Sequence, residues 1–530
     1  MPQFELVCFV LMLVAALDVV AGRMRLPYPV LMVLSGLALG LIPGLPQVAI
    51  APELVLPIFL PPLLFPAAFL TSFHDFQTNL RPILLLAVGL VLLTIVVVAQ
   101  VAHSFVSDLS WPAAFVLGAI VSTPDAIAAT AVFKSLEVPR RIVTILEGES
   151  LVNDTVALVA YRFATVAVIT GQFSAPAAAM QLPLVALGGA AIGGVVGLAV
   201  DWILRRIDDP PVQVTISLLA PFLAYLPADR VGASGALAIV TAGLFVGWRL
   251  PRMVTARTRL YMAAFWQMLI YLLNGIMFVF IGLQLPQVME GLKHKSMARL
   301  VMEAGIVSAA VIGVRFLWVF PAAYLPRFLF KKIRDRDPYP DWRHLVIIAW
   351  SGMRGVDSLA TALALPFITG AGGPFPGRDT IIFIAFVVIL VTLVAQGLTL
   401  PLLIRLLAVK GDGNADREEY IARQAANQAA LAYLENLEES EPEHRDQLEL
   451  LQAQYHERLA QLESSTDGAG VPINDEDRPA SPFHQLALQA LGVEREALVS
   501  LRNKHRINDE TLRVVQRDVD LAETRLVEME

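Results

Sequence analysis

A run of acidic and polar residues, Glu-Gly-Glu-Ser-Leu-Val-Asn-Asp at 147–154, lies near the start of a long apolar stretch. If this stretch is helical, Ser150 and Asp154 share one stripe of the helix surface. Glu149 and Asn153 share the neighbouring stripe. Carboxylates buried in hydrocarbon are costly, and they usually mark the path of an ion or a proton. The run therefore predicts an ion or proton site inside a membrane.

A second acidic residue, Asp125, lies in the middle of the preceding apolar stretch, within Val-Ser-Thr-Pro-Asp-Ala at 121–126. Pro124 removes a backbone donor and interrupts a helix there. Freed carbonyls at this depth must be satisfied, and lining an ion site is one way to do so. Discontinuous helices at the midplane are typical of secondary transporters. A proline kink with a locally paired aspartate is the alternative interpretation.

The chemistry that these residues predict is competition between a metal ion and a proton. Loss of water raises the pKa of a carboxyl group, whereas a bound cation lowers it. Hard alkali cations prefer oxygen ligands, as calcium does. Asp154 and Asp125 are the expected metal ligands for Na⁺, helped by the hydroxyl of Ser150 and backbone carbonyls near Thr123. A carboxylate in such a site can hold a cation or a proton, but not both tightly.

The composition predicts the elements that must position these residues. Hydrophobic residues make up 56% of the 530-residue chain and charged residues only 16%, with a mean hydropathy of +0.63. A soluble protein of this length could not bury so much apolar surface, so we expect a polytopic membrane protein. Thirteen apolar ranges are each roughly long enough to cross ~30 Å of hydrocarbon. They lie near 4–22, 28–43, 53–71, 82–104, 112–133, 142–167, 182–204, 212–227, 232–248, 261–286, 300–326, 344–367 and 380–407.

The loops between these ranges differ in positive charge. Odd-numbered loops carry eighteen Lys and Arg residues, and even-numbered loops carry five. By the positive-inside rule the odd-numbered loops are cytoplasmic. The N-terminus is then expected outside the membrane and the C-terminal tail in the cytoplasm.

The character of the chain changes after the last apolar range. We expect a transmembrane domain over 1–409 and a cytoplasmic helical tail over 410–530. Within the tail, 415–463 and 483–530 have the spacing of amphipathic helices, separated by a Ser, Gly, Pro and Asp-rich linker at 464–482. The tail is either a solvated helical hairpin or a regulatory or dimer-stabilising domain. The single cysteine excludes an intrachain disulfide.

A second interruption is expected in the twelfth apolar range, at Trp-Ser-Gly-Met-Arg-Gly-Val-Asp-Ser, 350–358. Its two glycines weaken the helix around Arg354, a cation that can offset the exposed carbonyl dipoles of broken helix ends. The fifth range is second to last in a block that ends with the sixth, and the twelfth is second to last in a block that ends with the thirteenth. This arrangement is consistent with two inverted repeats. Arg315, in the eleventh range, is the candidate ion-pair partner of Glu149, and we expect structural pairing for both arginines.

Together these residues resemble the monovalent cation:proton antiporter-1 family, the sodium/proton exchangers, and its bacterial branch most closely. The resemblance covers about residues 5–407 in order and spacing. It is carried by PPLLF at 61–65, STPDA at 122–126, EGESLVNDTVALV at 147–159, VRFLW at 314–318 and GMRGVDSLATALALP at 352–366. EGESLVND is the specific motif among these.

The resemblance implies an all-α fold of thirteen spans with inverted repeats and crossed, unwound helices, working as a homodimer. It implies that Asp154 is the essential ion- and proton-binding aspartate. The preceding asparagine, Asn153, is associated with electroneutral one-for-one exchange. Ser150 and Thr123 match accessory ligands. Asp125 matches the aspartate of the fifth span. Glu149 and Arg315 match the family's acid–arginine pair.

Three positions depart from the family pattern. The fifth-span order is Pro124-Asp125-Ala126 where many members have Thr-Asp-Pro, so the break is displaced. Pro66 stands where many members carry an acid after PPLLF, so a third acidic ligand is missing. Asp357 follows Arg354 where an apolar residue is usual. It either neutralises that arginine or adds a titrating group.

We therefore predict an antiporter, not an enzyme, that exchanges Na⁺, or Li⁺ or K⁺, for H⁺ in a bacterial-type plasma membrane. No nucleotide-binding motif is present, and we expect no cofactor and no nucleic-acid partner. The rival from another class is an intramembrane aspartyl protease with Asp125 and Asp154 as its dyad, although neither aspartate has a Gly-x-Gly-Asp context. A passive cation channel and an exchanger selective for potassium are further alternatives.

Overall fold

The fold was analysed in a computed structural model, which describes most of the chain. The described residues are 10–17, 19, 28–40, 42, 52–106, 109–134, 136, 138–171, 175–369, 373–409, 411, 414–440, 445–464 and 521–522.

Within these residues the protein is helical apart from turns, irregular segments and an isolated antiparallel bridge between Ile368 and Pro374. The chain separates into two compact units, Met1–Asp412 and Gly413–Glu530. The first unit contains the apolar helices and is described first.

Eight helical stretches of the described chain are long and apolar enough to cross a membrane. Each is a single helix or a run of consecutive helices in the first unit. They are α3 (Pro52–Leu70), the run α5 (Leu80–Leu84), η1 (Leu85–Leu90) and α6 (Val91–Phe105), α9 (Arg140–Thr170), α10 (Ala175–Leu204), α11 (Pro210–Arg230), α13 (Ala256–Gly291), α14 (Met297–Leu329), and the run α18 (Arg378–Val391), η2 (Thr392–Gln396) and α19 (Gly397–Leu406).

Shorter or less apolar helices occupy most of the remaining predicted ranges. They are α2 (Tyr28–Gly40), α7 (Trp111–Ser122), α12 (Gly235–Met253) and the helices of the twelfth range. Each predicted range from the second to the thirteenth therefore contains helix. The first is described only at 10–17 and 19, which are helical. The predicted fold class, an all-α polytopic membrane protein, is confirmed.

Two of the apolar ranges are interrupted, both where the sequence predicted it. The fifth range consists of α7, an irregular segment at 123–125 and α8 (Ala126–Lys134). The twelfth consists of α16 (Trp342–Trp350), a segment at 351–355 and α17 (Val356–Leu363). Pro124 causes the first break because it cannot donate to the helix ladder, and the glycines of the second segment have little helix propensity.

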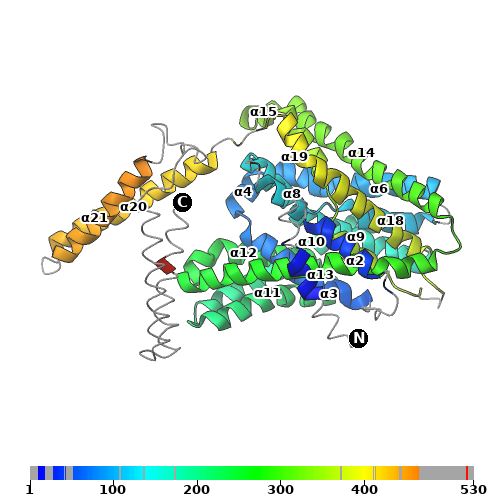
Figure 1. The fold of residues 1–530 in the computed structure, drawn as a ribbon, viewed down its shortest axis with the longest axis horizontal. Helices are drawn as coiled ribbons and strands as arrows, with labels where there is room; N and C mark the ends of the chain where they lie inside the picture. Colours follow the sequence, from blue (N-terminus) through cyan, green and yellow to red (C-terminus); the bar gives the residue numbers. More distant parts are fainter. Residues whose placement is uncertain are drawn as a thin grey trace. The chain divides into compact units, whose positions relative to one another are not determined.

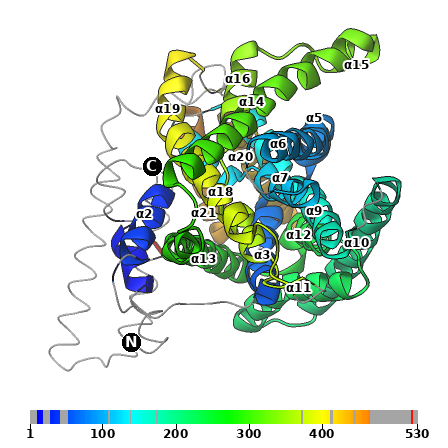
Figure 2. The same ribbon diagram turned by 90° about the vertical axis from the view of Figure 1, so that its right-hand side faces the viewer.

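The first unit has two main groups of packed helices. Helices α10, α11 and α12 contact one another and lie side by side in Figures 1 and 2. Their buried residues form one apolar cluster with those of α3 and α13. A larger cluster joins α6, α7, α9, α14 and α18 with the segments around both breaks. This second group positions the predicted site.

Lone polar residues inside the spans differ in part from expectation. We expected Asn274 and Ser234 to form interhelical hydrogen bonds. Among the residues that the structure describes, neither amide atom of the buried Asn274 has a hydrogen-bond partner. The Ser234 hydroxyl instead caps α12 by accepting from the N–H of Leu237 at 3.1 Å. A hydroxyl just before a helix finds an unpaired backbone donor at hand, so the local cap replaces the interhelical bond.

Arg162 and Asp18 are charged residues within apolar ranges, and their positions predict that they lie near the membrane edges. Arg162 is exposed and forms an ion pair with Asp229. Asp18 lies outside the described residues.

The second unit contains two helices that pack on each other, α20 (Asn414–Ser440) and α21 (Arg445–Ser464). The predicted amphipathic range 415–463 therefore consists of two helices. The linker at 464–482 and the range 483–530 lie outside the described residues, apart from residue 464 and the helical residues 521–522.

Candidate ion-binding site

The two broken segments meet inside the membrane unit. The backbone N–H of Asp125 donates to the carbonyl of Met353 at 2.7 Å. The hydroxyl of Ser358 lies 3.3 Å from both the hydroxyl and the carbonyl oxygen of Thr123. Backbone N–H and carbonyl groups that would form hydrogen bonds within a continuous helix thus form them between the two breaks. This arrangement satisfies backbone groups that could find no water in hydrocarbon.

Arg354 fills the crossing of these segments. Its side chain is buried, and its Nε donates to the carbonyl of Val121 at 3.0 Å. A second guanidinium nitrogen donates to the carbonyl of Gly352. Its own backbone N–H donates to the hydroxyl of Thr392 at 3.1 Å. The C-terminal carbonyls of a helix carry partial negative charge. Arg354 therefore offsets the exposed carbonyls of the broken helices, the structural role expected for it.

Gly355 allows the closest approach between the two breaks. The carboxyl group of Asp125 lies against its α-carbon, and a β-carbon at position 355 would overlap Oδ2 and Cγ of that aspartate. Asp125 itself is buried. A glycine is required where another group approaches the backbone this closely. The second break thus admits the carboxyl group contributed by the first.

Helix α9 presents the acidic motif to the same crossing. It runs through the motif without interruption and ends at Gly171, whose φ of +70° is the left-handed conformation typical of helix ends. The side-chain amide of Asn153 donates to the carbonyl of Pro124 at 3.0 Å. That carbonyl lies in the first break, so Asn153 ties α9 to it. Asn153 is fully buried.

Several buried side-chain oxygens on α9 have no hydrogen-bond partner in the described chain, and two of them belong to the predicted motif residues. Asn153 Oδ1 and Asp154 Oδ2 are buried, and no described residue forms a hydrogen bond with either. Buried polar atoms are normally paired, so each exception calls for an explanation. The hydroxyl of Thr155 is unpaired as well, so three successive residues carry an unpaired oxygen next to a broken helix. A bound cation or proton would complete such an arrangement. Ser150 is half-buried one turn earlier on α9.

A third acid, Asp357, joins the two predicted ones. It lies in the first turn of α17. It lies two residues after Gly355, against which the Asp125 carboxyl group packs. It forms no ion pair with Arg354, whose guanidinium binds carbonyls instead. Of the two roles left open by the sequence, the geometry therefore favours an added acidic group. In the described chain no three His, Cys, Asp or Glu side chains form a group that could hold a metal ion by themselves.

The predicted pairing of Glu149 with Arg315 is present. Two guanidinium nitrogens donate to the two carboxylate oxygens at 2.5 and 2.8 Å, and both side chains are 1% exposed. The Nε of Arg315 donates to the carbonyl of Ile348 in α16 at 3.0 Å. A bidentate pair of this kind fixes orientation as well as charge. It connects α9, α14 and α16 one turn from Asn153.

Sequence reasoning missed two hydroxyl residues of the crossing, Ser358 and Thr392. Ser358 lies inside the quoted motif at 352–366, but a single serine on an apolar helix carries no signal of its own. Thr392 lies in the π-helical segment η2, where it also donates to Val388. Pro66 is buried within α3 and supplies no acidic ligand.

The comparison with protein families agrees with this geometry. Residues 9–406 match the model of the family described as sodium/hydrogen exchanger, transmembrane. The chain belongs to the sodium/hydrogen exchanger family. As a member it is a multi-pass membrane protein that exchanges cations for protons, a transporter and not an enzyme. The protease reading of Asp125 and Asp154 is therefore set aside.

Relatives of the exchanger cover most of its length. An uncharacterized Na⁺/H⁺ exchanger of Mycobacterium tuberculosis is 36% identical over 99% of this chain and 97% of its own. The Na⁺/H⁺ antiporter ApNhaP of Aphanothece halophytica is 33% identical over 82% of this chain and 80% of its own. A sodium, potassium, lithium and rubidium/H⁺ antiporter of Bacillus pumilus is 33% identical over 76% of this chain and 61% of its own.

The fold of the exchanger is also found among solved structures. The sodium proton antiporter MjNhaP1 of Methanocaldococcus jannaschii superimposes with a TM-score of 0.60. The match covers 74% of this chain and 98% of MjNhaP1, at 20% sequence identity. At that identity the match establishes the shared fold.

Proposed function

We propose that the exchanger moves one Na⁺ against one H⁺, with Asp154 as the carboxylate for which the two ions compete. The observation that carries this proposal is the unpaired, buried Oδ2 of Asp154 beside the crossing of two broken helices. The other buried carboxylate of the motif, Glu149, is held by Arg315. Asp154 is thus the motif acid with coordination capacity to spare.

Competition alone couples the two gradients. A cation bound by Asp154 occupies the oxygen that a proton would take, so each loaded state carries one ion or the other. If the loaded protein reorients across the membrane and the empty protein does not, inward movement of one ion requires outward movement of the other. Asp125, Ser150 and the Thr123 region supply further oxygen ligands.

Asn153 supports a one-for-one exchange. Its amide is a neutral group that holds α9 against the Pro124 carbonyl, and it leaves Asp154 as the only titrating residue of the Asn-Asp pair. Exchange of one monovalent cation for one proton moves no net charge, so transport should not respond to membrane potential. A measurable current under a sodium gradient would contradict this stoichiometry.

The choice among cations is part of the same proposal. Oxygen ligands suit Na⁺, Li⁺ and K⁺ alike, and the named relatives include antiporters both for Na⁺ and for several alkali cations. We assign Na⁺ as the main substrate, with Li⁺ and K⁺ as the other candidates. The acid replaced by Pro66 is the feature of this chain most relevant to selectivity.

The assembly and orientation follow from the loop charges and the family. We propose a homodimer in the plasma membrane, with the N-terminus outside and the helical tail from residue 410 in the cytoplasm. The eighteen basic residues of the odd-numbered loops support this orientation. The tail is a regulatory or dimer-stabilising appendage of the exchanger.

The test is a proton-movement assay with the purified full-length protein in liposomes. A fluorescent pH probe reports dequenching after separate additions of Na⁺, Li⁺ and K⁺ across a pH series, with the membrane potential clamped at two values. We expect dequenching with Na⁺ that is equal at both potentials. Absence of dequenching with every cation would refute the proposal, and a response that changes with potential would refute electroneutrality.

A further inference from the structure

A cavity of about 360 Å³ lies away from the ion-binding site, between the ends of four helical elements. It is bordered by α5 and η1, the beginning of α9, the end of α14, and α16. All of these helix ends adjoin the odd-numbered loops, which carry the excess of Lys and Arg residues. Its volume falls in the range of small-molecule sites, roughly 300–1,000 Å³.

One side of the cavity is strongly basic. Arg81, Arg141 and Arg327, from three different helical elements, line it and converge on the single carboxylate of Asp337. The distances from their NH2 atoms to its oxygens are 2.7, 2.9 and 2.7 Å respectively. Asp341 also lines the cavity, and its Oδ1 accepts the N–H of Arg343 as a helix cap. Three arginines therefore face two carboxylates, Asp337 and Asp341, so positive charge still exceeds negative charge at this rim.

The arginines retain donors for a further anion. A guanidinium group has five N–H donors. Arg81 uses one on Asp337, and Arg141 uses two, on Asp337 and Asn79. Both side chains are partly exposed, whereas Arg327 is buried and bonded to backbone carbonyls as well. Arg81 and Arg141 are thus the accessible pair.

The charge imbalance is also visible in the one acid of the cluster. Burial alone would raise the pKa of Asp337, but hydrogen bonds and charge attraction from Arg141 and Arg327 outweigh burial and hold the pKa below its usual value. Asp337 therefore remains charged at neutral pH, and the three arginines still outnumber it.

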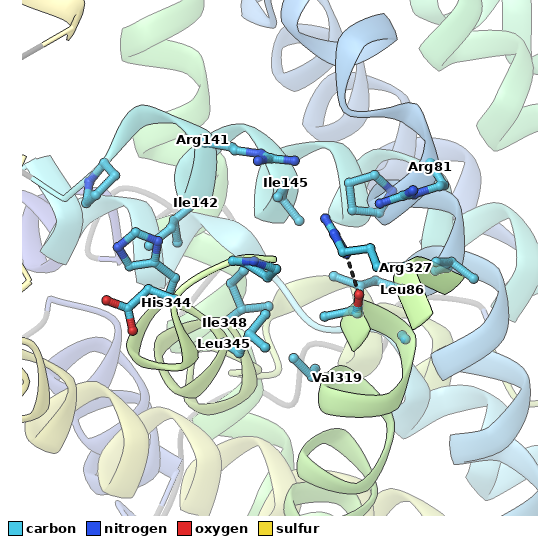
Figure 3. Close-up of a pocket in the computed structure, with 17 residues that line it drawn as sticks. Arg81, Leu86, Arg141, Ile142, Ile145, Val319, Arg327, His344, Leu345 and Ile348 are labelled. Carbon is cyan, nitrogen blue, oxygen red and sulfur yellow. Dashed lines mark hydrogen bonds between the residues drawn. The ribbon is translucent and has the colours of Figure 1, made fainter. Parts of the chain in front are cut away.

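Apart from Asp341 and His344, the rest of the cavity is lined by apolar residues. Figure 3 shows Arg81 and Arg141 along one side and Val319, Leu345 and Ile348 on the opposite side. A soluble anion would gain nothing from these aliphatic walls. An amphiphile would bury its first methylene groups against them while its head meets the arginines.

We propose that this cavity binds the phosphate headgroup and upper acyl chains of an anionic phospholipid. Basic pockets between transmembrane helices on the positively charged side of a membrane protein suit such headgroups. The phosphate lies between Arg81 and Arg141, and the chains follow the apolar wall toward Ile348.

The position of the cavity connects it with the ion-binding unit. The carbonyl of Ile348, on the cavity wall, accepts the hydrogen bond from Arg315 of the buried ion pair. Helix α16 then leads directly into the break that contacts Asp125. A bound lipid braces α16 against α9 and α14, the helices that carry Asp154 and Arg315. This binding is independent of which cation the exchanger moves.

The test measures lipid binding to the full-length protein, purified in neutral detergent and stripped of lipid. Phosphatidylglycerol or neutral phosphatidylcholine is titrated in, and bound lipid is counted by native mass spectrometry. The charge variant is Arg81→Gln/Arg141→Gln, with Arg336→Gln on the exposed face of α15 (Lys331–Arg336) as its matched control. The space variant is Ala322→Phe, which fills the cavity and keeps every arginine, with Ala322→Ser as its control.

We expect one phosphatidylglycerol to remain bound to the wild type and to both controls. The charge variant and the space variant should each weaken that binding by about tenfold or more. Unchanged binding in the space variant would overturn the proposal, and that variant decides the matter if the charge variant fails to fold. Inorganic phosphate that displaces the lipid and binds equally tightly would replace the phospholipid by a soluble anion and also overturn it.

Discussion

Two carboxylates on helix α9, five positions apart, are both buried but differ in their surroundings. Glu149 engages Arg315 through both oxygens. Asp154 has an oxygen with no partner in the described chain, next to the unpaired oxygen of Asn153. Burial alone therefore does not distinguish the two acids. Their free coordination positions do, and for this reason Asp154 rather than Glu149 is the proposed exchanging carboxylate, since an acid held through both oxygens by a guanidinium has none left for a cation.

The largest expected effect comes from removing the unsaturated acid. Asp154→Asn keeps the size of the side chain and removes its ability to hold a proton or balance a cation. Cation-driven proton movement in liposomes should fall to the level of empty vesicles, while the melting temperature in detergent is maintained. Exchange that persists at a measurable rate in this variant would remove Asp154 from the mechanism.

The second prediction breaks the saturated pair. Arg315→Met leaves the Glu149 carboxylate buried and unpaired, at a cost of about 3–5 kcal/mol of stability. We expect a lower melting temperature and a smaller folded fraction in detergent. The double variant Glu149→Gln/Arg315→Met removes the orphaned charge and should recover most of the loss. If single and double variants were equally destabilised, the pair would not be the source of the effect.

The third prediction concerns the amide between the two acids. Asn153→Ala deletes the donor to the Pro124 carbonyl and leaves that carbonyl unpaired, at a cost of about 1–3 kcal/mol. Because this bond joins α9 to the first break, we expect transport to slow by about tenfold and the protein to remain folded. The control is Thr94→Val, whose buried hydroxyl donates to the carbonyl of Leu90 one turn earlier in the same helical run; it should transport at the wild-type rate.

The smallest effect extends the comparison to an acid outside the membrane spans. The pKa of Asp337 is lower in the folded protein than its ordinary value of 3.8. Its stabilising contribution is therefore complete at neutral pH and is lost as the pH falls below that value toward the folded pKa. The difference in melting temperature between wild type and Asp337→Asn should be constant between about pH 7 and pH 5.5 and shrink below about pH 4. A difference that grew on acidification would contradict the ion cluster.

Much of this architecture was predictable because hydrocarbon restricts what a chain can do. The long apolar ranges predicted the spans. A proline in one range and glycines in another predicted the two breaks. Charged residues inside the ranges predicted the pairing of Glu149 with Arg315. These features are visible along one dimension of the sequence. The restriction is physical, since a buried charge needs a counter-charge in lipid and backbone groups freed by a helix break need new hydrogen-bond partners.

The contacts between the breaks were not predictable in the same way. Nothing in the sequence says that Ser358 reaches Thr123, or that Arg354 binds the carbonyl of Val121, because these depend on how helices cross in space. The unpaired amide of Asn274 and the capping role of Ser234 were missed for a related reason. A lone polar residue in an apolar range indicates that a hydrogen-bond partner is needed, but the sequence does not show which group the packing places beside it.

The close approach at Gly355 leaves almost no room for any other residue at that position. Replacement by alanine, the mildest mutation available, would place a methyl group where the Asp125 carboxyl group now lies. The two pieces of chain would have to separate, and the Asp125 carboxyl group would move away from the second break. A hydrogen atom in place of a methyl group thus sets how closely the two breaks can cross.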